Sequence, residues 1–428
     1  MDSIQLARFA AFSCIALCLA PCRAEEMAQP PESRIDVVQI TATRFGEPVQ
    51  EVPLSMSVVF HDELVARGAH DLRTALSLLG GAAVAPGGDA GPAGAVPALL
   101  GQREADDFLL LFEGVPAGGA YTSPFETITL ANVERIEVLR GPAPVYFGTT
   151  AFAGTINIIH YKAGTAAPEF TLAGGSHGSV AMSGARALST GVVKQSLALE
   201  LSHDGLSDPR AGVNRAKAGY RLGTPLAGGD LRFDFNFQLL KQKPASPTPV
   251  GEDGGLDTDL SPDFNQNPGD AHVDTQREQF VLGYGHGLGR YGQWDTTASW
   301  TITHVNAVQG FFREDFLEGG GEDEEGDDEN ALGTGQSRYL HDFFLDTHVT
   351  SSPVSWMDLT YGLNEIWGRA DQSSRSYEYH LPLDGSLPPP LATGDPEEQA
   401  TLKAGSSSPS PATARRSWPA RWAACARW

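Results

Sequence analysis

From residue 168 onward, the chain reads as segments of about 10 to 15 residues in which apolar and polar side chains loosely alternate. The clearest segment is 231–239, where odd positions are apolar and even positions are polar. A period of two indicates a β-strand with one apolar and one polar face. The pattern predicts nine strands, at 169–176, 179–188, 192–203, 212–223, 230–241, 277–288, 293–305, 339–350 and 356–370.

The alternation fits both a transmembrane β-barrel and a soluble β-sandwich. The connections favour the barrel. Some are only two or three residues long, whereas 243–274 and 306–337 run to about thirty. Short turns at one end and long loops at the other are typical of outer-membrane barrels.

Residues 51–161 have a different texture and predict a compact α+β domain of ordinary size. We expect strands at 55–60, 108–112, 133–139 and 155–160, a helical turn at 61–67 and a helix at 71–79. Glycine, proline and alanine predict a loop at 85–98, and Glu113-Gly114 predicts a turn.

The N-terminal residues 1–24 predict a cleaved signal peptide, with Arg8 before a short apolar stretch and small residues near Ala24. Residues 25–50 form a polar leader. Within it, residues 35–43 are β-prone and have no partner strand next to them in the sequence.

Composition excludes several classes of protein. A net charge of −23 argues against nucleic-acid binding. No apolar run reaches the roughly 20 residues that a membrane-spanning helix needs. Three of the four cysteines lie in the predicted signal peptide and the fourth is Cys425, so the mature domains are expected to have no disulfide framework and no thiolate metal site.

No motif predicts catalysis, a cofactor or a resident metal. The sequence Gly-Gly-Ser-His-Gly at 174–178 fits the G-x-S-x-G pattern, but strand-like segments flank it, so we expect a hairpin turn. The acidic run 322–329 is expected to be a solvated loop, with Ca²⁺ binding through its oxygen atoms as the alternative. His304 and His341 are expected to be ordinary strand residues.

The stretches 132–142, 146–148 and 153–159 closely resemble the plug domain of the TonB-dependent outer-membrane receptors, and the resemblance extends upstream to 52–59, 71–76 and 109–116. The plug-motif residues are Glu134, Arg135, Glu137, Arg140, Gly141, Pro142, Gly148, Gly154 and Asn157. The segment 35–43 is similar to the TonB box, with Ile35, Asp36, Val37, Val38, Gln39, Ile40 and Thr41 as its central residues.

The resemblance implies a receptor in the outer membrane of a Gram-negative bacterium, held in lipid by its barrel. It would take up a scarce extracellular nutrient, most often a metal chelate such as a ferric siderophore. Its partner would be the periplasmic domain of TonB, in the TonB-ExbB-ExbD complex, to which the TonB box would add a strand. The ligand-binding residues are not identified by the motifs.

We expect Ile136 and Val138 to face the plug core, while Glu134, Arg135, Glu137 and Arg140 find partners on the barrel wall, because a buried charge needs a partner. Three positions depart from the family pattern. The chain has Leu100-Gly101 for Arg-Gly, Glu113-Gly114 for Asp-Gly and Gly80-Gly81 for Pro-Gly.

The strand count is also unusual for this family. Plugged transporters need about 22 strands, and residues 168–403 predict about nine, hence a partial barrel. Residues 404–428 contain no acidic residue and lack strand alternation, which suggests translation in a shifted reading frame. The alternative to a transporter is therefore a truncated or frameshifted fragment without transport activity.

Overall fold

The computed structural model shows the plug strands and the long strands that follow them. It describes residues 38–39, 46–47, 55–69, 71–79, 82–84, 97–99, 108–118, 127–128, 130–141, 153–166, 168–206, 208, 210–244, 246, 261, 264–312, 330–354, 357–382, 384–386, 388, 390–391, 398–405 and 421–426. Within these ranges, no helix is long and apolar enough to span a membrane.

Five strands build a mixed sheet in the plug: β3 (Ser55–Phe60), β6 (Phe108–Phe112), β7 (Val115–Pro116), β8 (Val133–Arg140) and β9 (Gly154–His160). Their order is β3-β8-β9-β6-β7. Strands β6 and β9 run parallel, and the other neighbours are antiparallel. The four strands predicted in this region are confirmed.

Two short helices contribute to the plug core, α2 (His61–Ala66) and α3 (Leu72–Ser77). The Asp71 carboxylate caps α3 by accepting a hydrogen bond from the Thr74 amide at 2.6 Å. Buried side chains of α3 pack in one cluster with those of β8, where Ile136 and Val138 are fully buried as expected. Burial of each such side chain contributes about 1.5–3 kcal/mol.

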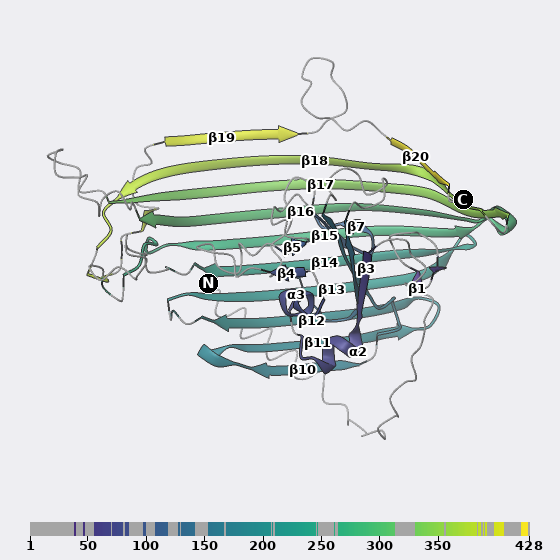
Figure 1. The fold of residues 1–428 in the computed structure, drawn as a ribbon, viewed down its shortest axis with the longest axis horizontal. Helices are drawn as coiled ribbons and strands as arrows, with labels where there is room; N and C mark the ends of the chain where they lie inside the picture. Colours follow the sequence, from purple (N-terminus) through teal and green to yellow (C-terminus); the bar gives the residue numbers. More distant parts are fainter. Residues whose placement is uncertain are drawn as a thin grey trace, which may run out of the picture. The chain divides into compact units, whose positions relative to one another are not determined.

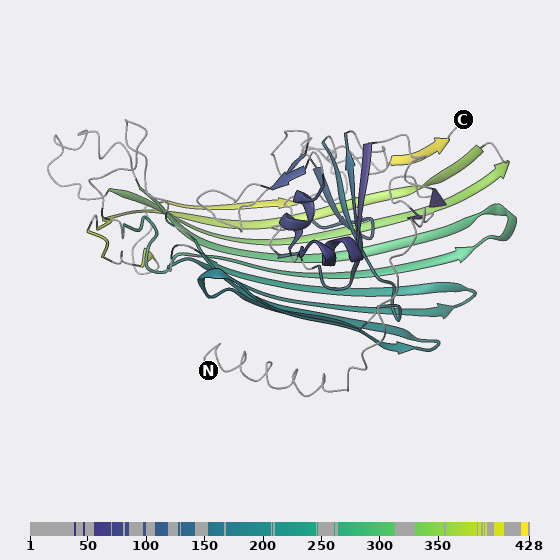
Figure 2. The same ribbon diagram turned by 60° about the horizontal axis from the view of Figure 1, so that its bottom comes forward.

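Nine antiparallel strands follow in chain order and confirm the nine predicted strands (Figure 1). They bend in the same sense (Figure 2). They are β10 (Glu169–Gly174), β11 (Val180–Thr190), β12 (Lys194–Gly205), β13 (Gly212–Leu226), β14 (Gly229–Lys243), β15 (His272–Gly287), β16 (Gln293–Phe312), β17 (Ala331–Val354) and β18 (Met357–Tyr379).

The large sheet has two chemically different faces. On β14, the even positions Asp234, Gln238 and Gln242 are buried, whereas the phenylalanines at the odd positions are partly exposed. The apolar face carries a row of aromatic cross-strand neighbours, in which Phe235 pairs with Phe280 and Phe280 with Trp300. Their ring centroids are 5.0 and 6.0 Å apart. The predicted alternation is therefore realised as a polar face and an apolar face.

At one end of the strands every connection is short, and at the other end two of the four connections are long, which agrees with the predicted inequality. Those at 191–193, 227–228, 288–292 and 355–356 are short, and those at 244–271 and 313–330 are long. The second long loop is shorter than the predicted 306–337 because β16 and β17 extend to 20 and 24 residues. The hairpin predicted at 174–178 is confirmed, since Gly174 pairs with Val180.

Several short pairings were not predicted. β1 (Val38–Gln39) pairs with β2 (Gly46–Glu47), so the expectation that this segment lacks a neighbouring partner was wrong. β4 (Ala82–Val84) pairs with β5 (Pro97–Leu99), so the loop predicted at 85–98 was wrong for residues 97–98, which belong to a strand.

Two further strands pair with β18. They are β19 (Glu398–Gly405) and β20 (Arg421–Ala426). Residues 404–405 and 421–426 are therefore strand residues, although the sequence of 404–428 lacks strand alternation. Backbone pairing with an existing edge does not require side-chain alternation.

Candidate functional site

The turn between β6 and β7 reaches from the plug toward the large sheet. It consists of Glu113 and Gly114, whose φ angles are +48° and +80°. The Gly114 amide donates to the Asn157 side chain at 3.1 Å. Two positive φ angles are typical of a two-residue hairpin turn that favours Asn, Asp or Gly. Glutamate in this conformation carries a conformational cost, which contacts of its side chain have to offset.

The Glu113 carboxylate joins three polar groups. Its Oε1 accepts hydrogen bonds from the His160 backbone amide at 2.9 Å and from Arg221 Nη2 at 2.8 Å, and His160 Nδ1 lies 2.7 Å away. Burial alone would raise the pKa of the Glu113 carboxyl, but Arg221 and His160 outweigh burial and hold that pKa well below its ordinary value. The group is therefore a carboxylate at neutral pH.

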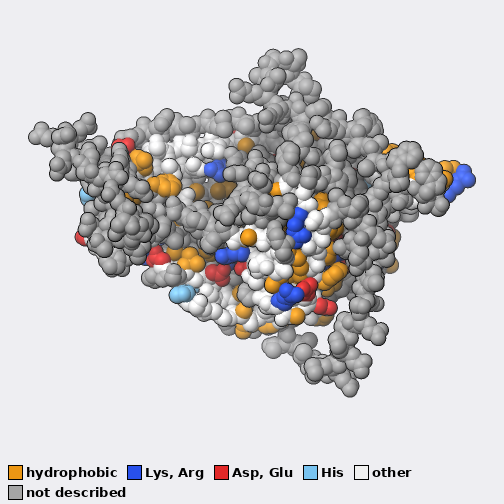
Figure 3. All heavy atoms as spheres, in the orientation of Figure 1, with side chains coloured by type: hydrophobic (Ala, Val, Ile, Leu, Met, Phe, Trp, Pro, Cys, Tyr) orange, Lys and Arg blue, Asp and Glu red, His pale blue; other side chains and the backbone are white. Residues whose placement is uncertain are grey.

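Arg221 belongs to β13, so the contact with Glu113 links the plug to the large sheet. The same guanidinium lies 3.4 Å from the Asp234 carboxylate on β14. All three side chains are at least nine-tenths buried. A buried charge is tolerated when it is paired, and here one arginine is held between a carboxylate of the plug and one of the sheet. Figure 3 shows basic and acidic side chains next to one another in the described part of one face of the molecule.

Two further polar links join the sheet to the plug, one from β13 and one from β15. Lys217 of β13 donates to the Ile128 carbonyl of the plug and forms an ion pair with Glu200 of β12 at 2.9 Å. Gln279 of β15 donates to the Pro116 carbonyl at 3.3 Å. Each is a hydrogen bond from the polar face of the sheet to the plug backbone.

Apolar contacts accompany these links. Val115 of the plug clusters with Val281 and Phe344 of the sheet, and Ala131 clusters with Ala185 and Ala198. The plug is therefore held on the sheet both by buried charge pairs and by small apolar patches.

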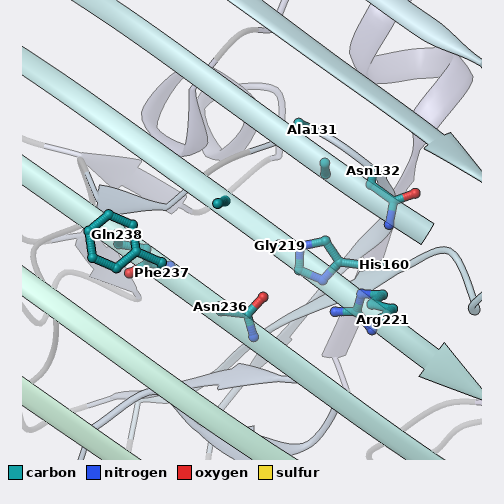
Figure 4. Close-up of a pocket in the computed structure, with 10 residues that line it drawn as sticks. Ala131, Asn132, His160, Gly219, Arg221, Asn236, Phe237 and Gln238 are labelled. Carbon is teal, nitrogen blue, oxygen red and sulfur yellow. The ribbon is translucent and has the colours of Figure 1, made fainter. Parts of the chain in front are cut away.

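A small cavity lies next to the Glu113–Arg221 contact. Its volume is about 20 Å³, and His160, Arg221 and Asn236 line it together with Asn132 (Figure 4). This volume suits roughly one water molecule and is far below the several hundred Å³ of a small-molecule pocket. The cavity is therefore a feature of plug seating rather than a ligand pocket.

The charged residues of the plug motif have partners inside the plug. Arg135 forms ion pairs with Glu134 at 3.3 Å and Glu137 at 2.9 Å, and Arg140 donates to the Ser57 hydroxyl at 2.9 Å. Asn157 Nδ2 lies 3.5 Å from Glu137 Oε2. Partners on the barrel wall remain a prediction for these side chains. A buried ion pair that crosses to the sheet is made by Glu113, which the motif did not single out.

The two described glycines of the motif occupy special conformations. Gly141 has φ +93° and Gly154 has φ +145°. A Cβ on Gly154 would lie 1.9 Å from the Leu139 carbonyl oxygen, so only glycine fits at the start of β9. Pro142 and Gly148 lie outside the described residues.

The segment expected to be the TonB box is described only in part. Val38 and Gln39 form β1, whereas Ile35, Asp36, Val37, Ile40 and Thr41 lie outside the described residues. The acidic run 322–329 and the signal peptide 1–24 also lie outside them. His304 and His341 are strand residues that stack on Tyr339 and Trp300.

Sequence reasoning missed Glu113, Arg221 and Lys217 as plug–sheet contacts and His160 as the plug residue that supports Glu113. One signal was present. Glu113 stands where the resembled family usually has aspartate, in a turn that disfavours glutamate. The sheet residues could be assigned to the polar face by alternation, but their plug partners depend on tertiary register.

Comparison with known proteins agrees with this architecture. Residues 48–155 match the TonB-dependent receptor plug domain. The chain is 33% identical over 174 residues to vitamin B12 transporter BtuB of Photobacterium profundum, covering 40% of this chain and 28% of that protein. It is 28% identical over 148 residues to an iron-regulated outer membrane virulence protein of Vibrio cholerae, covering 32% and 22%.

Among solved structures, the ferripyoverdine receptor of the outer membrane of Pseudomonas aeruginosa is similar in fold. The TM-score is 0.63 at 16% identity, covering 85% of this chain and 50% of that one. The chain thus spans about a quarter of the length of these two curated relatives and half the length of the solved receptor. The plug match assigns residues 48–155 to the TonB-dependent receptor plug domain, and the likeness to the solved receptor shows a shared fold over most of the chain.

Proposed function

We propose that this chain acts in the energy-coupled uptake of a scarce nutrient across the outer membrane, with the plug as its gate. The observation that carries the proposal is the seating of the plug on the polar face of the sheet through Glu113 and Arg221. Paired charges and small apolar patches give a contact that is stable yet can be separated, because each buried charge keeps a second partner. After separation, Arg221 would retain Asp234, and Glu113 would retain His160.

The apolar face of the sheet supports placement in the outer membrane. Large apolar side chains such as Leu172, Trp300 and Phe343 are exposed on it, and aromatic rows of this kind suit a lipid boundary. Export through the signal peptide at residues 1–24 belongs to the same proposal.

Coupling is proposed to run through the TonB box at 35–43, which would pair as an added strand with the periplasmic domain of TonB. A pull-down of the full chain with that domain tests this step. Deletion of residues 35–43 should abolish capture, while a matched deletion of 25–33 in the leader should retain it. Equal capture by both deletions would overturn the coupling proposal.

The proposed ligand is a ferric siderophore, as is common in the resembled family. A cobalamin is the second candidate, because a relative at 33% identity is named a vitamin B12 transporter. Uptake of ⁵⁵Fe-pyoverdine, ⁵⁵Fe-citrate and ⁵⁷Co-cyanocobalamin by cells expressing the chain separates the two. The alternative of a fragment without transport activity predicts no TonB-dependent uptake of any of these probes.

A further inference from the structure

Arg277 is a buried cation on the polar face of the large sheet. It lies on β15, between Thr275 and Gln279 on the same face, and its side chain is fully buried. Its cross-strand neighbours are Gln238 on β14 and Thr303 on β16. The surroundings of this charge are therefore neutral on both adjacent strands.

While the plug is seated on the sheet, most of the hydrogen-bond donors of the Arg277 guanidinium lack partners. Its Nη1 reaches Gln238 Oε1 at 3.4 Å, a long hydrogen bond, and its Nε and Nη2 have no hydrogen-bond partner. The acidic side chain whose charge acts on it is Asp342, which lies two strands away on β17. The Thr275 hydroxyl beside it is also buried without a partner. Orphaned donors of this kind are rare in folded proteins.

A plug side chain covers this cation. The Phe112 ring, at the end of β6, has its centroid 5.2 Å from Arg277 Cζ. A ring face attracts a cation, but it supplies no oxygen atom to the guanidinium nitrogens. Two other basic side chains at the plug–sheet contact, Arg221 and Lys217, differ from Arg277 because each forms an ion pair with a carboxylate.

We propose that Arg277, with Gln238 and Thr275, forms an anion-binding site that Phe112 covers while the plug is seated. Its ligand class is a carboxylate- or phosphate-type group, because two free guanidinium donors match two oxygen atoms of such a group. Displacement of β6 uncovers the site, and an anionic group in transit then takes the place of the ring. This role in transit rests on the proposed uptake function, whereas the binding site itself does not.

The test uses inorganic phosphate as the probe on the full chain, purified in detergent. Phe112→Ala removes the cover, so phosphate at constant ionic strength should raise its melting temperature by several degrees. The wild-type protein and the Phe112→Ala/Arg277→Gln double variant should show no such shift. An equal shift in the double variant, or none in Phe112→Ala, would overturn the proposal.

A second measurement does not depend on the stability of Phe112→Ala. Arg277→Met keeps an unbranched, largely apolar side chain and removes an unsatisfied buried charge. It should raise the melting temperature of the otherwise unchanged protein, and a lowered or unchanged value would contradict the assignment. Failure of radiolabel uptake by the wild-type chain would refute the proposed function and leave phosphate binding unaffected, so the two failures are distinguishable.

Discussion

Arg221 Nη2 donates to Glu113 Oε1 at 2.8 Å, and this contact joins a plug turn to a strand of the large sheet. Both side chains are about nine-tenths buried or more. The turn favours residues smaller than glutamate. The contacts of the Glu113 carboxylate with Arg221 and His160 offset the cost of the positive φ angle at this position.

Replacing Glu113 with glutamine should destabilise the seated plug. The variant loses the charge that Arg221 and His160 face, at a cost of roughly 1.5–3 kcal/mol in the free energy of unfolding. Chemical denaturation in detergent measures the change. Glu63→Gln is the matched control, because the Glu63–Arg67 ion pair is exposed and should contribute less than about 0.5 kcal/mol. Equal effects of the two substitutions would refute the assignment.

The stability contribution of Glu113 should depend on pH. The folded-state pKa of its carboxyl lies below the ordinary value of 4.5, so its contribution is fully present above pH 4.5 and is lost as the pH falls further. The difference in melting temperature between wild type and Glu113→Gln should therefore shrink below pH 4.5. A difference that stays constant into this acidic range would show that the carboxylate charge is not responsible.

Gly154→Ala should disrupt the plug. The substitution places Cβ 1.9 Å from the Leu139 carbonyl oxygen and requires a φ of +145°. The backbone conformation alone costs about 1–3 kcal/mol, and the clash adds to it. Limited proteolysis should cleave the plug of this variant much faster than that of wild type. Gly287→Ala is the control, because its Cβ meets nothing within 4 Å; comparable cleavage of both would contradict the packing described.

Lys217 and Glu200 form the second charge pair of the interface. Lys217→Met leaves Glu200 buried without its cation and should destabilise the protein by about 3–5 kcal/mol. The double variant Lys217→Met/Glu200→Met should recover a large part of that loss, because no buried charge is left unpaired. Strictly additive effects in a double-mutant cycle would show that the two side chains do not act as a pair.

Much of the architecture follows from local patterns. Alternation located all nine strands from β10 to β18, because a sheet with one polar and one apolar face repeats every two residues. The plug strand β6 was predicted at 108–112, and its five apolar residues are all buried. Strand ends were less predictable, since β16 and β17 extend past the alternating segments into their hairpins.

The contacts between plug and sheet could not be predicted. Glu113 and Arg221 are 108 positions apart, and their approach depends on the register of β13 against β14 and on the seating of the β6–β7 turn. The orphaned state of Arg277 is likewise invisible in the sequence, because alternation gives its face but not its neighbours.

Under the proposed function, the plug has to leave the sheet during uptake. Val115 of the plug and Val281 of the sheet lie in one buried cluster, so cysteines are placed at these two positions in a Cys425→Ser background, and the oxidised, cross-linked protein is isolated. Uptake of ⁵⁵Fe-pyoverdine or ⁵⁷Co-cyanocobalamin, whichever the wild-type chain transports, is then measured before and after reduction. The oxidised protein should not take up the probe, and reduction should restore uptake to the wild-type level. Undiminished uptake by fully cross-linked protein would contradict this prediction.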